Sequence, residues 1–138
     1  MSLTRRRFTQ ILASTLFLHH LPSFAQSVKF WASRTLPEAQ NITRIVSAGA
    51  PADLLLLAVA PEKMVGFSSF DFARQALIPL PEHIRQFPRL GRLAGRASTL
   101  SLEGLMALHP DLVVDCGNTD ETWISQARQV SEQTQIPW

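Results

Sequence analysis

Residues 44–69 constrain the fold of this chain more than any other stretch, because they predict a strand, a short loop, a helix and a second strand in succession. The β-branched run at residues 44–47 favours an extended strand. Gly49 permits a sharp turn, and Pro51 suits the first turn of a helix, where its missing N–H would have no partner anyway. Residues 64–67 predict the next strand. This order is one parallel crossover unit, which predicts an α/β fold.

The helix within this unit carries two further signals. Asp53 lies in its first turn, where the helix dipole favours an anion. Residues 54–59 are apolar all round, so we expect the helix to be buried. Crossover units place their binding loops at the carboxyl ends of the strands. We therefore expect residues 48–51 and 67–69 to face one cleft.

The rest of the chain repeats the alternation of strand and helix, which predicts a parallel, Rossmann-like sheet with helices on its faces. Residues 98–101 offer hydroxyl oxygens to cap a helix, and Asn118 with Glu121 three residues later is close to a capping box. The predicted elements are a short helix near 72–77, a turn or two at 82–86, a helix at 102–108, a strand at 111–116, a helix at 120–133 and the approach to another strand at 136–138. The helix at 102–108 has an apolar face of Leu102, Leu105, Met106 and Leu108. In the helix at 120–133, we expect Trp123, Ala127 and Val130 to face inward.

The first 25 residues predict a signal peptide. Three arginines at 5–7 precede an apolar run at 11–18 that is too short to span a bilayer, and small residues follow at a site for cleavage after Ala25. Residues 4–8 also resemble a twin-arginine export signal, although Thr9-Gln10 replaces the usual Leu-Lys, so the export route stays open. The alternatives are a buried first helix and a retained membrane anchor. We expect export to the periplasm.

The formal net charge of +2 owes its sign to those three arginines. Without residues 1–25 the chain has ten Lys and Arg against eleven Asp and Glu, a net charge of −1, which argues against a nucleic-acid partner. The single cysteine, Cys116, excludes an internal disulfide and a Cys-x-x-Cys metal site. His83 and His109 have no partner at ligand spacing, so we expect no metal site and no cofactor.

Three patterns together carry a resemblance to a known family. The first is Thr-Arg-Ile-Val-Ser at 43–47, with its proline-initiated helix and Val-Gly-Phe-Ser at 65–68. The second is Pro-Arg-Leu-Gly at 88–91 before Ser-Leu-Glu-Gly-Leu at 101–105, and the third is Ala-Leu-His-Pro-Asp-Leu-Val-Val at 107–114. In this order, behind an export signal, they resemble the N-terminal lobe of the periplasmic substrate-binding proteins of ABC importers for iron–siderophore, haem and cobalamin compounds.

The resemblance implies a bilobal protein that holds its ligand between two lobes joined by a rigid helix. It divides the chain into a signal peptide (1–25), a leader (26–42) and an incomplete N-terminal lobe (43–138), with a fragment of a longer protein favoured over a truncated product. The implied function is capture of an iron–siderophore or related metal chelate and its delivery to an ABC permease in the inner membrane, by a monomer that performs no chemistry. Ferric siderophore, haem, cobalamin and simpler nickel or iron chelates all stay open as the ligand.

The candidate ligand-binding residues lie on strand-end loops and are small or carry hydrogen-bond donors: Gly49, Ala50, Ser68, Ser69, Arg92 and Asn118. Arg92 lies in a glycine-flanked loop and suits an anionic ferric chelate, with a solvated charge as the alternative. The others could instead serve only a turn, a strand end or a helix cap. Glu103 resembles the glutamate with which this family's first lobe docks onto the permease, and it also suits the helix dipole.

A doubly wound enzyme or nucleotide-binding domain is the main alternative function. Residues 48–52 hold no phosphate-binding glycine motif, however, and no nucleophile elbow or Ser-His-Asp spacing appears. Cys116 ends a predicted strand, and we interpret it as a small core residue; a reactive thiol there would be the remaining enzymatic possibility. A non-functional remnant without a stable fold is the third hypothesis.

Overall fold

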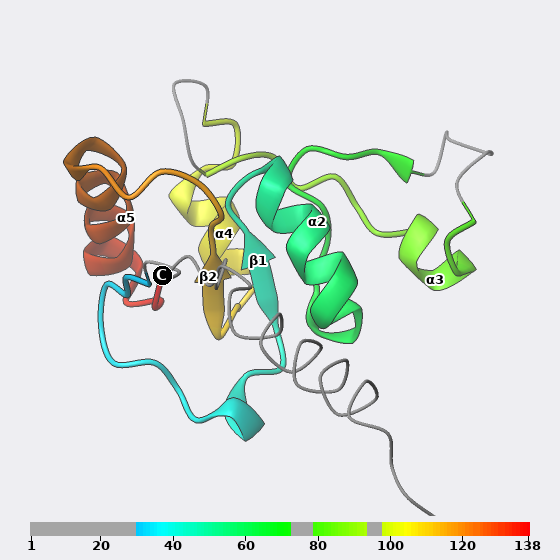
Figure 1. Ribbon diagram of the computed structural model, residues 1–138, viewed down its shortest axis with the longest axis horizontal. Coiled ribbons are helices and arrows are strands. Elements are labelled where there is room, and N and C mark those ends of the chain that lie inside the picture. The colour runs from blue at the N-terminus through cyan, green and yellow to red at the C-terminus, as the bar shows by residue number, and fades with distance from the viewer. Residues whose placement is uncertain (1–29, 73–78, 94–97) are drawn as a thin grey trace, which may run out of the picture.

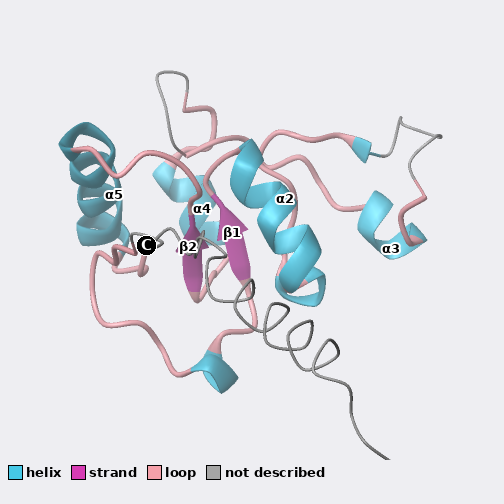
Figure 2. Cartoon of the chain, viewed as in Figure 1, coloured by secondary structure: helices cyan, strands magenta, loops and turns pink. Residues whose placement is uncertain are grey.

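The computed structural model describes residues 30–72, 79–93 and 98–138. The predicted signal peptide and nearly all of the helix predicted at 72–77 lie outside the described residues. Two strands, β1 (Ile45–Ser47) and β2 (Leu112–Val114), lie side by side at the centre, and helices surround them (Figures 1 and 2). The helices are α2 (Ala50–Val59), α3 (Glu82–Arg85), α4 (Leu102–Ala107) and α5 (Glu121–Thr134), with short 3-10 turns η2 (Ala39–Asn41) and η3 (Pro61–Lys63). The predicted α/β architecture is confirmed.

The two strands are parallel, and single hydrogen-bonded contacts extend the sheet on both sides. Ile45 pairs with Leu112 and Ser47 with Val114 in the β1–β2 register. Beyond β1, isolated parallel bridges join Ile45 to Met64 and Phe67 to Arg89. Beyond β2, the Val113 amide donates to the Pro137 carbonyl at 2.9 Å. The segments therefore follow the order 88–90, 64–68, β1, β2, 136–138, and the strand predicted at 64–67 forms only as these bridges.

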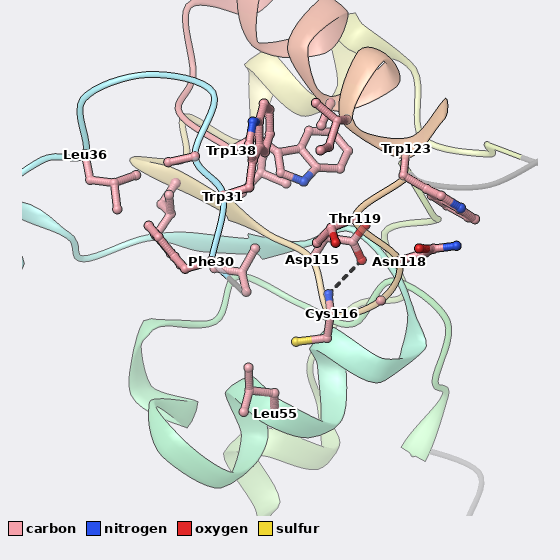
Figure 3. Close-up of a pocket in the computed structure, with 17 residues that line it drawn as sticks. Phe30, Trp31, Leu36, Leu55, Asp115, Cys116, Asn118, Thr119, Trp123 and Trp138 are labelled. Atoms are coloured by element: carbon pink, nitrogen blue, oxygen red, sulfur yellow. Dashed lines mark hydrogen bonds between the residues drawn. The ribbon is translucent and has the colours of Figure 1, made fainter. Parts of the chain in front are cut away.

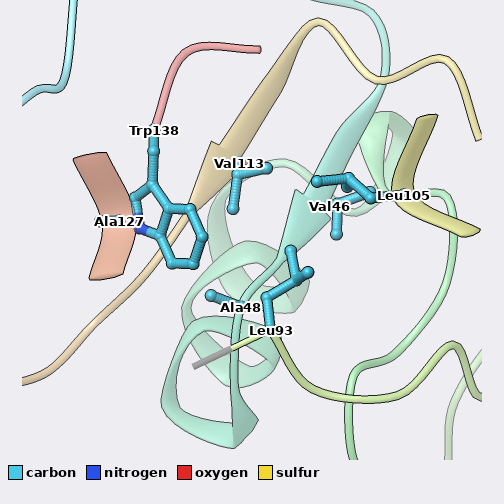
Figure 4. Close-up of a cluster of buried hydrophobic side chains, with 7 residues drawn as sticks. All are labelled: Val46, Ala48, Leu93, Leu105, Val113, Ala127 and Trp138. Carbon is cyan, nitrogen blue, oxygen red and sulfur yellow. The ribbon is translucent and has the colours of Figure 1, made fainter. Parts of the chain in front are cut away.

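Two apolar cores lie on opposite faces of the sheet, because successive residues of a strand point to opposite sides. Val46 and Val113 join a cluster with Leu105 of α4 and Ala127 of α5 (Figure 4). Ile45, on the other face, packs with Leu56 of α2, Met64 and the phenylalanines at 67 and 72. Helices thus cover both faces, as the alternating pattern predicted.

Helix α2 starts where predicted, with Pro51 in its first turn, but the prediction that it is buried is wrong. Leu54, Leu55 and Val59 are 53%, 44% and 67% exposed. These side chains are exposed because α2 packs on the sheet with one side only, through Leu56, and none of the described segments covers its outer side. An apolar sequence all round a helix does not by itself supply a second packing partner.

The helix ends confirm one capping prediction and correct another. The Ser101 hydroxyl accepts the Gly104 amide at 3.0 Å, so Ser101 caps α4 as expected. The cap of α5 is Asp120, which accepts the Trp123 amide at 3.2 Å; the prediction of Asn118 in this role is wrong. The inward face of α5 centres on Ala127 as predicted, whereas Met106 of α4 is 44% exposed rather than in the core.

Within the ranges that the structure describes, no helix is long and apolar enough to cross a membrane. The same described ranges hold no cluster of His, Cys, Asp and Glu side chains that could bind a metal ion.

Candidate functional site

The loops at the carboxyl ends of the strands form the candidate site, and one of them is held by a buried carboxylate. Asp53, in the first turn of α2, is fully buried. It accepts hydrogen bonds from the Ser47 hydroxyl, from the Ser68 amide at 2.8 Å and hydroxyl at 2.9 Å, and from the Ser69 amide at 3.0 Å. Asp53 therefore does more than complement the helix dipole: it ties the end of β1 and the 68–69 loop to α2.

This arrangement separates the two candidate serines. Ser68 is 1% exposed and its hydroxyl is bound by Asp53, so the side chain positions the loop. Ser69 is half-buried, and its amide also donates to Asp53. Of the pair, Ser69 is the one whose side chain reaches the accessible edge.

Gly49 and Ala50 lie where β1 passes into α2, next to the end of β2. Gly49 has an extended backbone (φ −163°), so the sharp turn expected there does not require a glycine. A methyl group at Gly49 would lie 4.0 Å from Asp115 Oδ1. The residues that follow β1 and β2 are therefore close together. Ala50 is half-buried as the first residue of α2.

The loop that carries Arg92 crosses the end of β1. The amide of the following residue, Leu93, donates to the Ala48 carbonyl at 3.0 Å. Within the loop, the Arg92 amide donates to the Thr99 hydroxyl at 3.0 Å and the Arg92 carbonyl accepts the Thr99 amide at 2.9 Å. Arg92 is exposed. The fold therefore brings the Arg92 backbone to the same strand end as Gly49.

Asn118 follows β2 and lies at the rim of a cavity of about 460 Å³. Its side-chain amide donates to Asp120, the cap of α5. The cavity lies along β2 between α5, the leader and α2, as Figure 3 shows. Its lining is mostly apolar and consists of Phe30, Trp31, Ala32, Leu36, Leu55, Leu112, Val113, Val114, Asp115, Cys116, Gly117, Asn118, Thr119, Trp123, Ile124, Ala127 and Trp138.

Among the described residues of that lining, Asp115 is the only acidic or basic one, and it faces a poorly solvated environment. Burial raises the pKa of its carboxyl above the ordinary value of 3.8, partly offset by the Cys116 amide that donates to Oδ1 at 2.8 Å. Burial, and then the neighbouring Asp115 charge, also raise the pKa of the Cys116 thiol above 9.0. A thiol of this kind is a weak nucleophile at neutral pH.

The prediction that Cys116 is a core residue is wrong. Its thiol is only partly buried and belongs to the lining of the cavity. The chain leaves the sheet after Val114, so the predicted strand at 111–116 is shorter than expected and Cys116 falls in the loop beyond it.

Glu103, the candidate docking residue, lies in the first turn of α4 and is exposed. Its position is accessible to a partner and also favourable for the helix dipole.

Comparisons with known proteins support the fold. No family model matches this chain, and no curated protein matches it. Among solved structures, an ABC transporter solute-binding protein from Sulfurospirillum deleyianum DSM 6946 is similar, with a TM-score of 0.58 and 21% identity. The match covers 75% of this chain and 32% of that protein. The described residues therefore share the parallel α/β fold of about a third of that protein.

The candidate set from the sequence missed Asp115 and the aromatic residues around the cavity. Asp115 lies at a carboxyl strand end, the same criterion that selected Gly49 and Asn118, but the predicted strand ran past it. Trp31, Trp123 and Trp138 come from three distant segments, so no local pattern could bring them together.

Proposed function

We propose that this chain forms the ligand-capturing N-terminal lobe of an exported solute-binding protein of an ABC importer. The observation that supports this most is the fold, which resembles part of such a protein, with three loops at the carboxyl ends of neighbouring parallel segments. Ligands of parallel α/β sheets bind outside those ends. The lobe would close on its ligand against a second lobe, as a monomer and without catalysing a reaction.

The ligand in this proposal is an iron–siderophore or a related metal chelate. Arg92 is exposed beside the end of β1, where a guanidinium can pair with the carboxylate or catecholate oxygens of an anionic chelate. Gly49 and Ala50 let a ligand approach the backbone, while Ser69 and Asn118 supply polar groups. Ser68 contributes indirectly, by holding its neighbour through Asp53.

Equilibrium dialysis of the purified chain tests this function. The probes are ferric citrate, a ferric catecholate, haemin and cyanocobalamin, with bound iron or cobalt measured by mass spectrometry. We expect saturable binding of an anionic ferric chelate, weakened roughly tenfold by Arg92→Ala because one charge-assisted hydrogen-bond pair is lost. Arg89→Ala is the matched control, since Arg89 is exposed in the same segment. Absence of saturable binding for all four probes, or equal effects of both variants, would contradict the proposal.

Export can be tested separately. Replacing the arginine pair by Arg5→Lys with Arg6→Lys should retain the precursor in the cytoplasm if the twin-arginine route is used. Arg7→Lys is the control, because the third arginine lies outside the invariant pair. N-terminal sequencing of the periplasmic product should begin at Gln26. If the double variant is exported unchanged, the prediction of a signal peptide stands, but export is assigned to the general secretory route instead of the twin-arginine route.

Docking of the lobe on its permease rests on Glu103. The charge reversal Glu103→Arg should reduce co-purification with the permease and leave chelate binding unchanged. Glu62→Arg, a reversal at another exposed glutamate, should leave both properties unchanged. A loss of chelate binding in the Glu103 variant would place this residue in the ligand site instead.

A further inference from the structure

The hydrogen bonds that Asp53 accepts fix the direction of the hydrogen bonds beyond it. Its Oδ1 accepts the Ser47 hydroxyl and the Ser68 amide, and its Oδ2 accepts the Ser68 hydroxyl and the Ser69 amide. A carboxylate has about four acceptor positions, so donors fill all of them. The Ser68 hydroxyl has a single hydrogen, and it gives that hydrogen to Asp53.

Ser69 is the next member of this chain of polar groups. Its Oγ lies 3.3 Å from the Oγ of Ser68. Because Ser68 has no second hydroxyl hydrogen to give, Ser69 is the donor in this contact and Ser68 is the acceptor. The hydroxyl hydrogens therefore all point the same way, from Ser69 to Ser68 and from Ser68 to Asp53.

This direction leaves Ser69 with acceptor capacity only. Its hydrogen is turned inward, and within the described ranges its oxygen accepts no hydrogen bond, so its lone pairs are open to a ligand. Ser69 is half-buried at the accessible edge, whereas Ser68 is 1% exposed. A freely rotating hydroxyl donates or accepts, whereas the hydroxyl of Ser69 is held as an acceptor.

The neighbouring segment supplies a group of the opposite kind. Phe67 pairs with Arg89 in a parallel bridge, and the Leu90 amide donates to the Phe67 carbonyl at 2.8 Å. Ser69 lies two residues beyond Phe67 and Arg92 two residues beyond Leu90, so both follow the carboxyl ends of adjacent segments. A guanidinium has only donors, so Arg92 and the Ser69 oxygen favour different parts of a ligand.

We propose that Ser69 selects metal chelates that carry an N–H or O–H donor beside their anionic oxygens, and that it fixes the orientation in which they bind. The anionic oxygens face Arg92, and the donor gives its hydrogen to Ser69 Oγ. An anionic oxygen at Ser69 would meet lone pairs and is disfavoured there. The selection rests on the proposed function, because the ligand is the one that these loops capture.

Two ferric chelates that differ in a single donor test this selection. They are the tris complexes of the N-methylamide and of the methyl ester of protocatechuic acid. The two have the same charge and nearly the same shape, and the ester has an oxygen in place of the amide N–H. Equilibrium dialysis against the full chain, with bound iron measured by mass spectrometry, gives both affinities. We expect the amide chelate to bind about tenfold more tightly, because the ester brings an oxygen instead of a donor to the Ser69 lone pairs.

Two serine variants separate this selection from a structural role of the loop. Ser69→Ala removes the acceptor and should make the two affinities equal. Ser68→Ala frees the Ser69 hydroxyl to donate as well as accept, so the preference should fall to about twofold while both chelates still bind. A purely structural role of Ser68 would instead weaken both chelates by the same factor. Ser125→Ala, at an exposed serine of α5, is the control and should keep the parent ratio.

Equal binding of the two chelates by the parent protein, or tighter binding of the ester, overturns the selection by Ser69 and leaves the proposed function standing. A parent ratio that survives Ser69→Ala also overturns it. Binding of neither chelate overturns it too, and the proposed function is then decided by its own four probes. The comparison of the two chelates uses the unaltered chain, so it stays decisive if a variant fails to fold.

Discussion

The carboxylate of Asp53 accepts hydrogen bonds from both the amide and the hydroxyl of Ser68, at 2.8 and 2.9 Å, across fifteen positions of sequence. Asp53 is fully buried, so these bonds, with those from Ser47 and Ser69, replace the water that would otherwise bind its carboxyl oxygens. The candidate ligand loop is therefore attached to the helix that precedes it.

Asp53→Ala should lower the free energy of unfolding by about 3 kcal/mol, because it leaves several buried donors without an acceptor. Ser68→Ala removes only the hydroxyl bond and should cost about 1 kcal/mol. Urea unfolding followed by circular dichroism measures both values. Equal losses for the two variants would mean that Asp53 does not hold the loop as described.

Gly66→Ala should destabilise the fold by a few kcal/mol, since overpacking typically costs about 1–3 kcal/mol. A methyl group at Gly66 would lie 2.6 Å from the Pro88 carbonyl oxygen and 2.8 Å from Leu90 Cγ. Gly117→Ala is the matched control, because nothing lies within 4 Å of a methyl group there. Thermal unfolding of both variants compares them, and a control that loses as much stability would contradict the packing argument.

Acid should weaken the attachment of Asp111 to the start of β1. The Thr43 and Arg44 amides, donating at 2.8 and 2.9 Å, hold the pKa of this carboxyl below 3.8. A depressed pKa stabilises the folded state above the unfolded value, and this contribution is lost as pH falls from about 4 through the folded pKa. Asp111→Asn should remove that part of the pH dependence between pH 7 and 2.

The measurement for this prediction is urea unfolding across that pH range. Thr43→Val serves as the control, since it deletes the hydroxyl donor at 2.9 Å and keeps both amides. It should reduce the pH dependence less than Asp111→Asn does. An unchanged pH dependence in Asp111→Asn would show that other carboxylates carry it.

Asp115 should have the opposite pH signature. Burial raises the pKa of its carboxyl above 3.8, so its ionisation opposes folding increasingly as pH rises above that value. Asp115→Asn should therefore increase the free energy of unfolding at pH 7, and the gain should vanish below about pH 3.5. A variant that is less stable than the parent at pH 7 would contradict this account.

The single thiol provides a separate test of the same pair. Because burial and the Asp115 charge raise the pKa of Cys116 above 9.0, the folded protein should react with a thiol reagent at pH 8 more slowly than the unfolded chain. Asp115→Asn removes the charge and keeps a side-chain oxygen for the Cys116 amide, so it should speed the reaction. Reaction of the folded parent at the unfolded rate would indicate an activated thiol and revive the enzymatic alternative.

The parts of the fold that could be predicted from the sequence depend on local signals. The β-branched run at β1, the proline at the start of α2 and the serine cap of α4 each act within a few residues. The cap of α5 was misplaced because Asn118 and Asp120 both suit the role locally, and helix geometry selects the residue three positions before Trp123.

The rest could not be predicted because it depends on contacts between distant segments. The apolar sequence of α2 gave no information about how many layers would cover it, and Leu54 and Val59 are exposed. Asp53 looked like a helix-dipole residue, since its Ser68 partner belongs to another loop. The cavity is formed jointly by α5, the leader and α2, which are distant in sequence. The position of Asp115 in its lining therefore could not be predicted from local sequence.

The two hydrogen bonds between Ser33 and Trp138 join residues 105 positions apart, and the Ser33 hydroxyl also donates to Ser131 at 2.7 Å. Closing so long a loop costs conformational entropy that only prior packing of the intervening segments can offset. We therefore expect this contact to form late in folding, after α5 has packed on the sheet, because contacts between residues so far apart in sequence form slowly. During synthesis from the amino end, Ser33 cannot make this contact until the chain as far as Trp138 has been made.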